Sequence, residues 1–246
     1  MGWYQDTTNK IHGFLFAEGV FSTIDAPDAL IQTEAYGIND SRQIVGRYQQ
    51  GVTGKIHGFS LTMGSFSTID IPGALETSLF GINDPGHIVG LYEDATGKIH
   101  GLMLVHGNLS TVDPPGAGES AAFGINNRDR IVGSYDDASG MFHGFLFADG
   151  SFTQIDVPGA LETRAFGIDH RRRIVGFYVD TTGKIHGFLH VKENFITIDA
   201  PDALSTQTFG INTSGHIVGR YTDSTGKGHG FLATPNDHED GGESGD

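Results

Sequence analysis

The sequence predicts an all-β fold, a five-bladed β-propeller whose four-stranded blades arise from a 43-residue repeat. A Gly-Ile-Asn or Gly-Ile-Asp motif recurs every 43 or 44 residues along the chain, at Gly37, Gly81, Gly124, Gly167 and Gly210. Each repeat contains four short runs of β-branched and aromatic residues, separated by Gly, Asn, Asp and Pro, which is typical of strands and turns. Helical periodicity is sustained nowhere.

The four runs of one repeat are clearest between residues 123 and 156. The first strand is expected at 123–126 (FGIN) and the second at 131–135 (IVGSY). The third begins at His143 with His-Gly-Phe, and the fourth covers 152–156 (FTQID). These runs are largely apolar on both faces, as strands buried between neighbouring sheets should be.

The links between the runs indicate the topology. Three links in each repeat are short enough for hairpins. The fourth is longer and carries Pro-Gly-Ala, as in residues 157–164. A link of this kind would carry the chain from the outer strand of one blade to the inner strand of the next. Five first strands therefore predict five blades.

Closure of the ring is expected to use strands from both termini. The fourth-type strand at 21–25 would complete the last blade, which begins at Phe209. Both ends also carry a second–third hairpin, so one copy is surplus and could pair with another molecule. We expect the propeller to span residues 1–234, followed by a disordered acidic tail at 235–246. Gly2-Trp3-Tyr4 aligns with the interior of a repeat strand, which favours a trimmed or processed form of a longer chain.

Composition limits the partners. The net charge of −15 argues against binding to nucleic acid or to an anionic membrane surface. No apolar run approaches the roughly 18 residues that a membrane-spanning helix needs. Cysteine is absent, so the chain has no disulfide framework and no thiolate metal site.

The pattern HGFLF-x3-FxxID-xPGA-xxT-xAFGIN-xxGxIVGxY resembles the bacterial HAF-type "probable extracellular repeat" family. The match covers residues 1–234, with single departures such as Ser60 and Leu102 in the third strand. The resemblance implies a β-propeller-like, exported protein, either extracellular or periplasmic. It implies no catalytic residues.

Polar residues that occur once per repeat are predicted to be structural. Six histidines begin the third strands, at His12, His57, His100, His143, His186 and His229. They could form a metal site, but we predict that each instead bonds an Asp at a neighbouring strand end, such as Asp25 or Asp70. The Asp-x-Thr-Gly-Lys turns resemble calcium loops, but bonding within the turn explains them. No metal and no cofactor is predicted.

The positions that differ between repeats are the better candidates for function. Those between the Pro-containing turn and the first strand are expected to reach the mouth of the central channel. The candidate ligand-binding residues there are Gln32, Glu34, Glu76, Glu119, Glu162, Arg164 and Gln207. On the opposite face, the run Arg171-Arg172-Arg173 could meet an acidic glycan or partner, although a solvated turn is the favoured interpretation.

These observations favour a non-enzymatic binding or scaffold protein with a glycan or protein partner, lectin-like if the ligand is a carbohydrate. One alternative is a self-assembling structural protein that exchanges its duplicated terminal hairpin. A second is a polysaccharide-acting glycosidase or lyase that uses the loop carboxylates Glu34, Glu76, Glu119 and Glu162. No catalytic motif in a strand–turn–helix context supports an enzyme.

Overall fold

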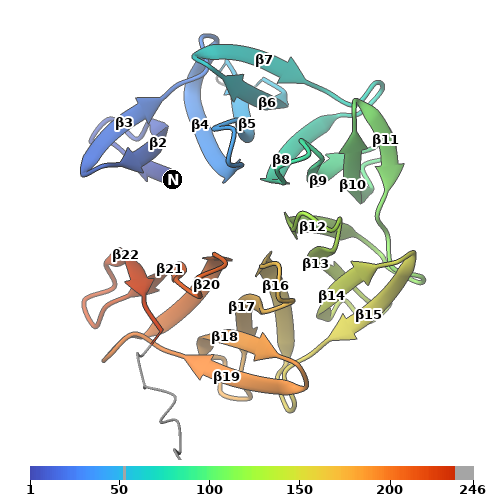
Figure 1. The fold of residues 1–246 in the computed structure, drawn as a ribbon, viewed down its shortest axis with the longest axis vertical. Coiled ribbons are helices and arrows are strands. Elements are labelled where there is room, and N and C mark those ends of the chain that lie inside the picture. The colour runs from blue at the N-terminus through green and yellow to red at the C-terminus, as the bar shows by residue number, and fades with distance from the viewer. Residues whose placement is uncertain (52–53, 236–246) are drawn as a thin grey trace, which may run out of the picture.

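A computed structural model describes residues 1–51 and 54–235, which form strands β1 to β22 and no helix. The sheets are set around a ring, with the inner edges towards the centre (Figure 1). Their strands pair antiparallel, apart from one parallel bridge between Ile11 of β2 and Gln32 of β4 that joins the N-terminal strands to the next blade. The prediction of an all-β propeller is confirmed. The predicted tail falls largely on 236–246, outside the described residues.

Four blades are complete, and in each the strands follow the predicted order from the inner to the outer edge. Blade 1 consists of β4 (Ala29–Ile38), β5 (Ile44–Gln50), β6 (Ile56–Thr62) and β7 (Ser65–Ile69). Blade 2 consists of β8 (Glu76–Ile82), β9 (Ile88–Glu93), β10 (Ile99–Val105) and β11 (Asn108–Thr111). Blade 3 consists of β12 (Ser120–Ile125), β13 (Ile131–Asp136), β14 (Phe142–Ala148) and β15 (Ser151–Ile155). Blade 4 consists of β16 (Glu162–Ile168), β17 (Ile174–Val179), β18 (Ile185–Val191) and β19 (Asn194–Ile198).

Two three-stranded units occupy the rest of the ring. The N-terminal unit consists of β1 (Gly2–Gln5), β2 (Ile11–Ala17) and β3 (Val20–Ile24), and it lacks a first strand. The C-terminal unit consists of β20 (Ser205–Ile211), β21 (Ile217–Thr222) and β22 (Gly228–Ala233), and it lacks a fourth strand among the described residues. The two units are neighbours in the ring (Figure 1).

The predicted closure is wrong. β3 pairs with β2 in its own unit, with Phe16 opposite Phe21, and β22 pairs only with β21. The reason is that β3 is already engaged, since Ile24 and Ala26 are buried against blade 1 and Asp25 bonds His12. Five blades remain a prediction, because the described residues form four complete blades and two incomplete units.

The junctions between units explain the repeated glycines. A Cβ added to Gly37, Gly81 or Gly167 would lie 2.8–2.9 Å from the backbone oxygen of a Phe on the next first strand. Only glycine allows the backbones of adjacent first strands to approach this closely. The second strand of each blade then buries a valine completely against the next unit, at Val45, Val89, Val132 and Val175.

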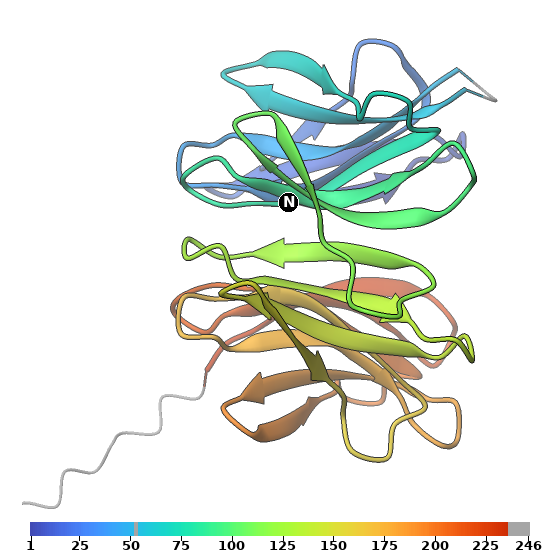
Figure 2. The ribbon, with the colours of Figure 1, turned by 90° about the vertical axis from the view of Figure 1, so that its right-hand side faces the viewer.

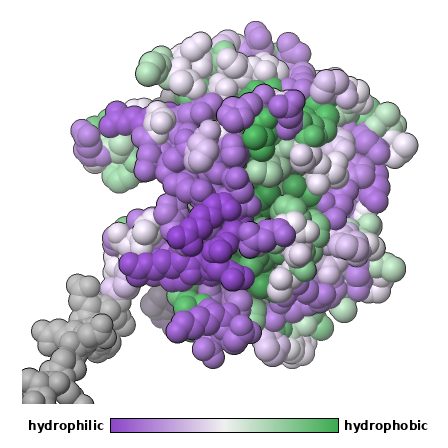
Figure 3. Space-filling model, turned by 45° about the vertical axis from the view of Figure 1, so that its right-hand side comes forward, coloured by the Kyte–Doolittle hydropathy of each residue, from purple (hydrophilic) through white to green (hydrophobic). Residues whose placement is uncertain are grey.

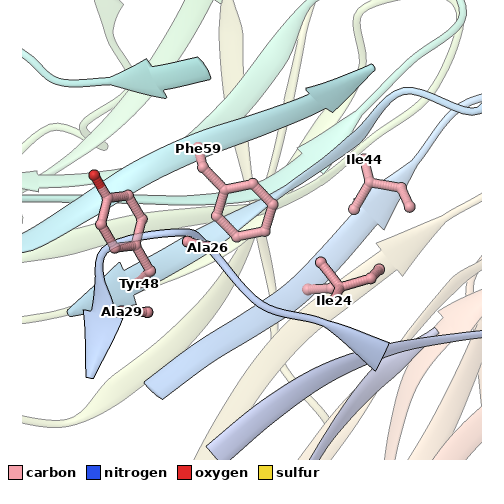
Figure 4. Close-up of a cluster of buried hydrophobic side chains, with 7 residues drawn as sticks. Ile24, Ala26, Ala29, Ile44, Tyr48 and Phe59 are labelled. Atoms are coloured by element: carbon pink, nitrogen blue, oxygen red, sulfur yellow. The ribbon is translucent and has the colours of Figure 1, made fainter. Parts of the chain in front are cut away.

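One hydrophobic cluster joins the N-terminal unit to blade 1. Ile24 and Ala26 come from the end of β3 and the link after it, and they pack with Ile44, Tyr48 and Phe59 of blade 1 (Figure 4). All five side chains are buried. Burying each of the larger ones stabilises the fold by roughly 1.5–3 kcal/mol.

An amide ladder links the turns after the first strands. The side chain of Asn39 donates to the backbone oxygen of Asn83, Asn83 donates to Asn126, and Asn126 donates to Asp169, at 2.9–3.1 Å. The carboxylate side chain of Asp169 has no N–H to continue the series. Arg173 replaces that donor: it bonds the Asp169 carboxylate at 2.7 Å and the backbone oxygen of Asn212 at 3.2 Å.

The turns of the hairpins protrude on both sides of the ring (Figure 2). The face seen in Figure 3 is mostly hydrophilic, and a band of hydrophobic side chains runs across it. Nothing in the described ranges is a helix long and apolar enough to cross a membrane.

Candidate ligand-binding site

Five of the six repeated histidines bond an Asp at a neighbouring strand end, as predicted, whereas His229 lies 2.7 Å from Asp223 in its own turn. The Nδ1 atoms of His57 and His186 lie 2.8 and 2.7 Å from carboxylate oxygens of Asp70 and Asp199, at the ends of the adjacent fourth strands. The same bond occurs at His12, His100 and His143. A histidine that each blade already uses in this way is a poor candidate for a ligand site.

The Asp-x-Thr-Gly-Lys turns also bond internally, as predicted. Oδ1 of Asp94 accepts hydrogen bonds from the backbone and hydroxyl of Thr96 and from the backbone of Lys98, at 2.6–3.1 Å. Its other oxygen lies 3.3 Å from Nε2 of His100. These bonds lower the pKa of Asp94, chiefly through the Thr96 hydroxyl, so the carboxylate is held as an anion by its own turn.

The predicted channel-mouth residues lie on or just before the first strands, as the repeat requires. Glu34 is buried and forms an ion pair with Arg47, next to Tyr36. Burial raises the pKa of Tyr36 strongly, so its phenol stays protonated. Burial also raises the pKa of Glu76, and the nearby Glu93 adds to the effect. Glu119 is exposed.

Blade 4 holds a second group of these residues. The guanidinium of Arg164 lies 3.5 Å from Glu162 and 3.7 Å from the centre of the Phe142 ring on blade 3. Gln207 and Gln32 are half-buried on β20 and β4. The seven residues are therefore spread over five first-strand regions around the centre, and their role in binding stays a prediction.

A pocket of about 710 Å³ lies elsewhere, between blades 3 and 4. We call it the blade 3–4 pocket. Its walls are β14 and β15 of blade 3 and the β16–β17 turn, β18 and β19 of blade 4. The β16–β17 turn contributes Arg171, Arg172 and Arg173, so the basic run borders a hollow.

Blade 4 departs from the other repeats at this pocket. His190 occupies a third-strand position that holds Leu61, Leu104 and Phe147 in blades 1 to 3. Its ring stacks on Phe195 with centroids 4.4 Å apart. The corresponding Phe147 and Phe152 rings of blade 3 lie 4.6 Å apart. A polar ring thus replaces an apolar one without changing the packing.

The charge around the blade 3–4 pocket is positive, although the chain as a whole has a net charge of −15. Four cationic side chains line it, with the anions Asp156 and Glu193. Arg173 already bonds the Asp169 carboxylate and the backbone oxygen of Asn212. Arg171 and Arg172 are exposed. Burial lowers the pKa of His190, which keeps its imidazole neutral near pH 7; Glu193 opposes this effect and Arg172 adds to it.

Two buried polar atoms of residues that line the pocket have no hydrogen-bond partner within the described part of the chain. They are Nδ1 of His190 and Oδ1 of Asp156. Buried polar atoms in folded proteins are nearly always paired, so each unpaired one calls for an explanation.

Sequence reasoning found only part of this site. The basic run stands out in the sequence because three consecutive arginines are unusual in an acidic chain. His190 does not stand out, because it lies inside an otherwise regular third strand. Alignment of the six third strands by their His-Gly motif shows the signal, since only this copy has His where the others have Phe, Leu or Ala.

The fold is similar to solved structures that include lectins. AofleA from Arthrobotrys oligospora is 14% identical with a TM-score of 0.58, over 94% of this chain and 78% of that one. A mutant of Aleuria aurantia lectin, in complex with α-methyl-L-fucoside, is 10% identical with a TM-score of 0.59, over 96% and 87%. The BP39L lectin from Burkholderia pseudomallei is 14% identical with a TM-score of 0.52, over 94% and 76%.

At these identities the likeness establishes the β-propeller fold and nothing finer. The Aleuria aurantia lectin has been described as a six-bladed β-propeller with a novel mode of fucose recognition. No family model and no curated protein matches the chain.

Proposed function

We propose that this propeller is a non-enzymatic carbohydrate-binding protein whose principal site is the blade 3–4 pocket. The observation that carries the proposal is the coincidence, in one pocket, of the basic turn Arg171-Arg172-Arg173 and the stacked His190–Phe195 pair. The likeness to the Aleuria aurantia lectin, a β-propeller, supports the same class of function by analogy of fold.

The chemistry of the pocket suits a sugar. A sugar ring has an apolar C–H surface and a rim of hydroxyls, and ligand pockets combine apolar walls with a few placed polar groups. Phe195 and the apolar side chains of β14 and β15 supply the wall. Asp156 and His190 also line the pocket and add polar groups to it.

The ligand class that fits best is an acidic sugar, such as a uronic acid. Arg171 and Arg172 are exposed at the rim, and a guanidinium binds a carboxylate through two parallel hydrogen bonds. The repeat resembles the HAF-type "probable extracellular repeat" family, which implies export. We therefore also propose that the protein is extracellular or periplasmic. The channel-mouth residues, among them Glu76, Glu119 and Glu162, remain the alternative location for a glycan site.

A glycan array that includes neutral, uronic and sialylated glycans tests the proposal. The variants replace blade 4 residues by those of other repeats: Arg171→Ser, Arg172→Gly and His190→Leu. Arg172 has φ of 63°, and its equivalents in blade 2 and the C-terminal unit, Gly86 and Gly215, also have positive φ, so glycine preserves the turn. Arg128→Ser removes the corresponding exposed arginine of blade 3 and is the matched control.

We expect acidic glycans to bind the native chain and the Arg128→Ser control, and to bind the three blade 4 variants at least tenfold more weakly. The site would instead lie at the channel mouth if glycan binding is unchanged in the three blade 4 variants but is lost in Glu76→Ala, Glu119→Ala or Glu162→Ala. An array without any glycan hit would refute carbohydrate binding.

A further inference from the structure

A smaller pocket, of about 120 Å³, lies where the link after β3 meets blade 1. The link contributes residues 26–28, and blade 1 contributes Tyr48 of β5, Phe59 of β6 and residues 66–68 of β7. We call it the Asp28 pocket. It shares no lining residue with the blade 3–4 pocket, so the two are separate sites.

The Asp28 pocket exists because the link carries a small residue at this junction. Ala26 occupies the position that holds Ile71 after blade 1 and Val157 after blade 3. Ile71 is buried in a cluster with Leu102 of blade 2, and Val157 packs against the cluster that contains Phe188 of blade 4. An alanine at the same position leaves part of this space unfilled.

Three aromatic residues of blade 1 border this space. Tyr48 and Phe59 are buried and pack with Ala26, so they form the floor of the pocket (Figure 4). Phe66 is half-buried on β7, and its ring centroid lies 5.3 Å from that of Phe59. The Tyr48 ring is held in place, because its hydroxyl lies 2.9 Å from the hydroxyl of Thr68. The walls are therefore aromatic and preorganised.

No other junction to a complete blade combines a small link residue with three aromatic rings. Blade 2 has Leu102 and Leu109 in place of two of the rings, and the links before blades 3 and 4 carry Pro114 and Val157 in place of the alanine. The C-terminal unit follows Ala200 but has no fourth strand among the described residues. The Asp28 pocket is thus a departure of one copy from the repeat.

The rim of the pocket carries a negative charge. Asp28 is exposed, whereas the equivalent residues in the links to blades 2, 3 and 4 are glycines, Gly73, Gly116 and Gly159. The exposed side chains of Ser67 and Thr68 add hydroxyl oxygens. None of the described residues that line the pocket is basic. The electrostatics of the rim therefore favour a cation.

We propose that the Asp28 pocket binds a small organic cation of the methylated ammonium class. Such an ion has an apolar surface around its charge, and aromatic rings attract a cation of this kind through their quadrupoles. The Asp28 carboxylate supplies the opposite charge at the rim. A divalent metal ion fits less well, because it requires about six oxygen ligands and the rim offers one carboxylate.

The size of the pocket agrees with this class of ligand. A cavity of about 150 Å³ binds benzene, so 120 Å³ admits one compact head group and excludes a sugar chain. The proposal is consequently independent of carbohydrate binding at the blade 3–4 pocket, and either can fail without the other.

The test is a titration of the full chain with choline, followed by NMR through the backbone amide signals of Asp28 and Thr68. The ligand control is dimethylbutanol, the neutral isostere in which carbon replaces the nitrogen of choline. Ala26→Val fills the pocket, and Asp28→Asn removes the charge at nearly constant shape. Ala200→Val and Asp202→Asn make the same changes in the link before the C-terminal unit and are the matched controls.

We expect saturable shifts of both amide signals, and an affinity roughly tenfold lower for dimethylbutanol than for choline. Ala26→Val should abolish binding and Asp28→Asn should weaken it roughly tenfold, whereas both controls should bind as the native chain does. Circular dichroism verifies that the variants fold. The absence of saturable shifts, equal affinity for dimethylbutanol, or native affinity in Asp28→Asn would overturn the proposal.

Discussion

Glycines at the contacts between strands show how closely this fold depends on single residues. Gly46 on β5 has a backbone oxygen, that of Glu34, 2.0 Å from the place where a Cβ would lie, and the Phe59 ring at 2.7 Å. Neither group can withdraw, because one is backbone of a paired strand and the other is fully buried. Glycine is required here by space.

Gly46→Ala should therefore destabilise the chain by about 3 kcal/mol, at the upper end of the range for overpacked cores. Gly228→Ala is the matched control, because a Cβ there meets no atom within 4 Å. Chemical denaturation with a linear extrapolation measures both. Equal stability of the two variants would contradict the packing model.

The turn aspartates make stability depend on pH. Asp6 accepts hydrogen bonds from the hydroxyl and backbone of Thr8, and these bonds, with the hydroxyl first, lower the pKa of Asp6 to about 2. Since the folded pKa lies below the unfolded value, the stabilisation is present above about pH 4 and is lost as the pH falls towards about 2.

Denaturation midpoints should thus fall between about pH 5 and pH 2. The decline should be shallower in Thr8→Val, which removes the hydroxyl that contributes most to the shift. Asp94, Asp137, Asp180 and Asp223 have pKa values lowered in the same direction, so part of the decline will persist in this variant. A native chain with a flat profile over this range would be inconsistent with these bonds.

At the scale of elements, a buried threonine ties each of the inner strands β4, β8, β16 and β20 to the link that precedes it. Oγ1 of Thr77 accepts from the backbone N–H of Ile71 at 3.0 Å, and Thr163 does the same for Val157 at 3.1 Å. Thr77 is fully buried, so its removal would leave a buried donor unpaired.

Thr77→Val, which keeps the shape, should cost about 1–3 kcal/mol of folding free energy. Thr77→Ser keeps the hydroxyl and should retain most of the stability. A Val variant as stable as the native chain in thermal and chemical denaturation would show that water satisfies Ile71 instead.

The amide ladder offers a second test between elements, with its control already in the sequence. Arg173→Gln leaves the buried Asp169 carboxylate without its cation, and we expect a loss of about 3 kcal/mol. The double variant Asp169→Asn with Arg173→Gln recreates the Asn39–Gln43 pair of blade 1. It should recover most of the loss, and a double-mutant cycle measures the coupling. If the losses of stability from the two single variants simply add in the double variant, Asp169 and Arg173 are not coupled, and the proposed role of Arg173 in the ladder is wrong.

At the scale of the whole molecule, the sequence predicted what every repeat shares. The 43-residue period and the lengths of the links led to the strand order of the blades, and the His–Asp bonds followed from their recurrence. Closure was not predictable, because it depends on a competition for β3 between its own hairpin and β22. Burial of Ile24 against blade 1 decides that competition, and burial of this kind is a property of the assembled ring.

The site was predictable only in part for a related reason. Repeats mark structural positions, and function is expected where one copy departs from the rest. The Arg171-Arg172-Arg173 run was visible as such a departure, but the sequence did not show that the same pocket receives His190 from the end of β18. Conversely, Glu34 varied between repeats and was a candidate, and the structure places it in a buried ion pair with Arg47.

The measurement that tests the central claim most directly is a calorimetric titration of the chain with an acidic oligosaccharide, such as an oligogalacturonide. Because blade 4 alone combines the basic turn with His190, we predict one site per chain, and binding that is lost in the combined variant Arg171→Ser, Arg172→Gly, His190→Leu. Four or more equivalent sites per chain, or unchanged binding by this variant, would contradict a single site at the blade 3–4 pocket.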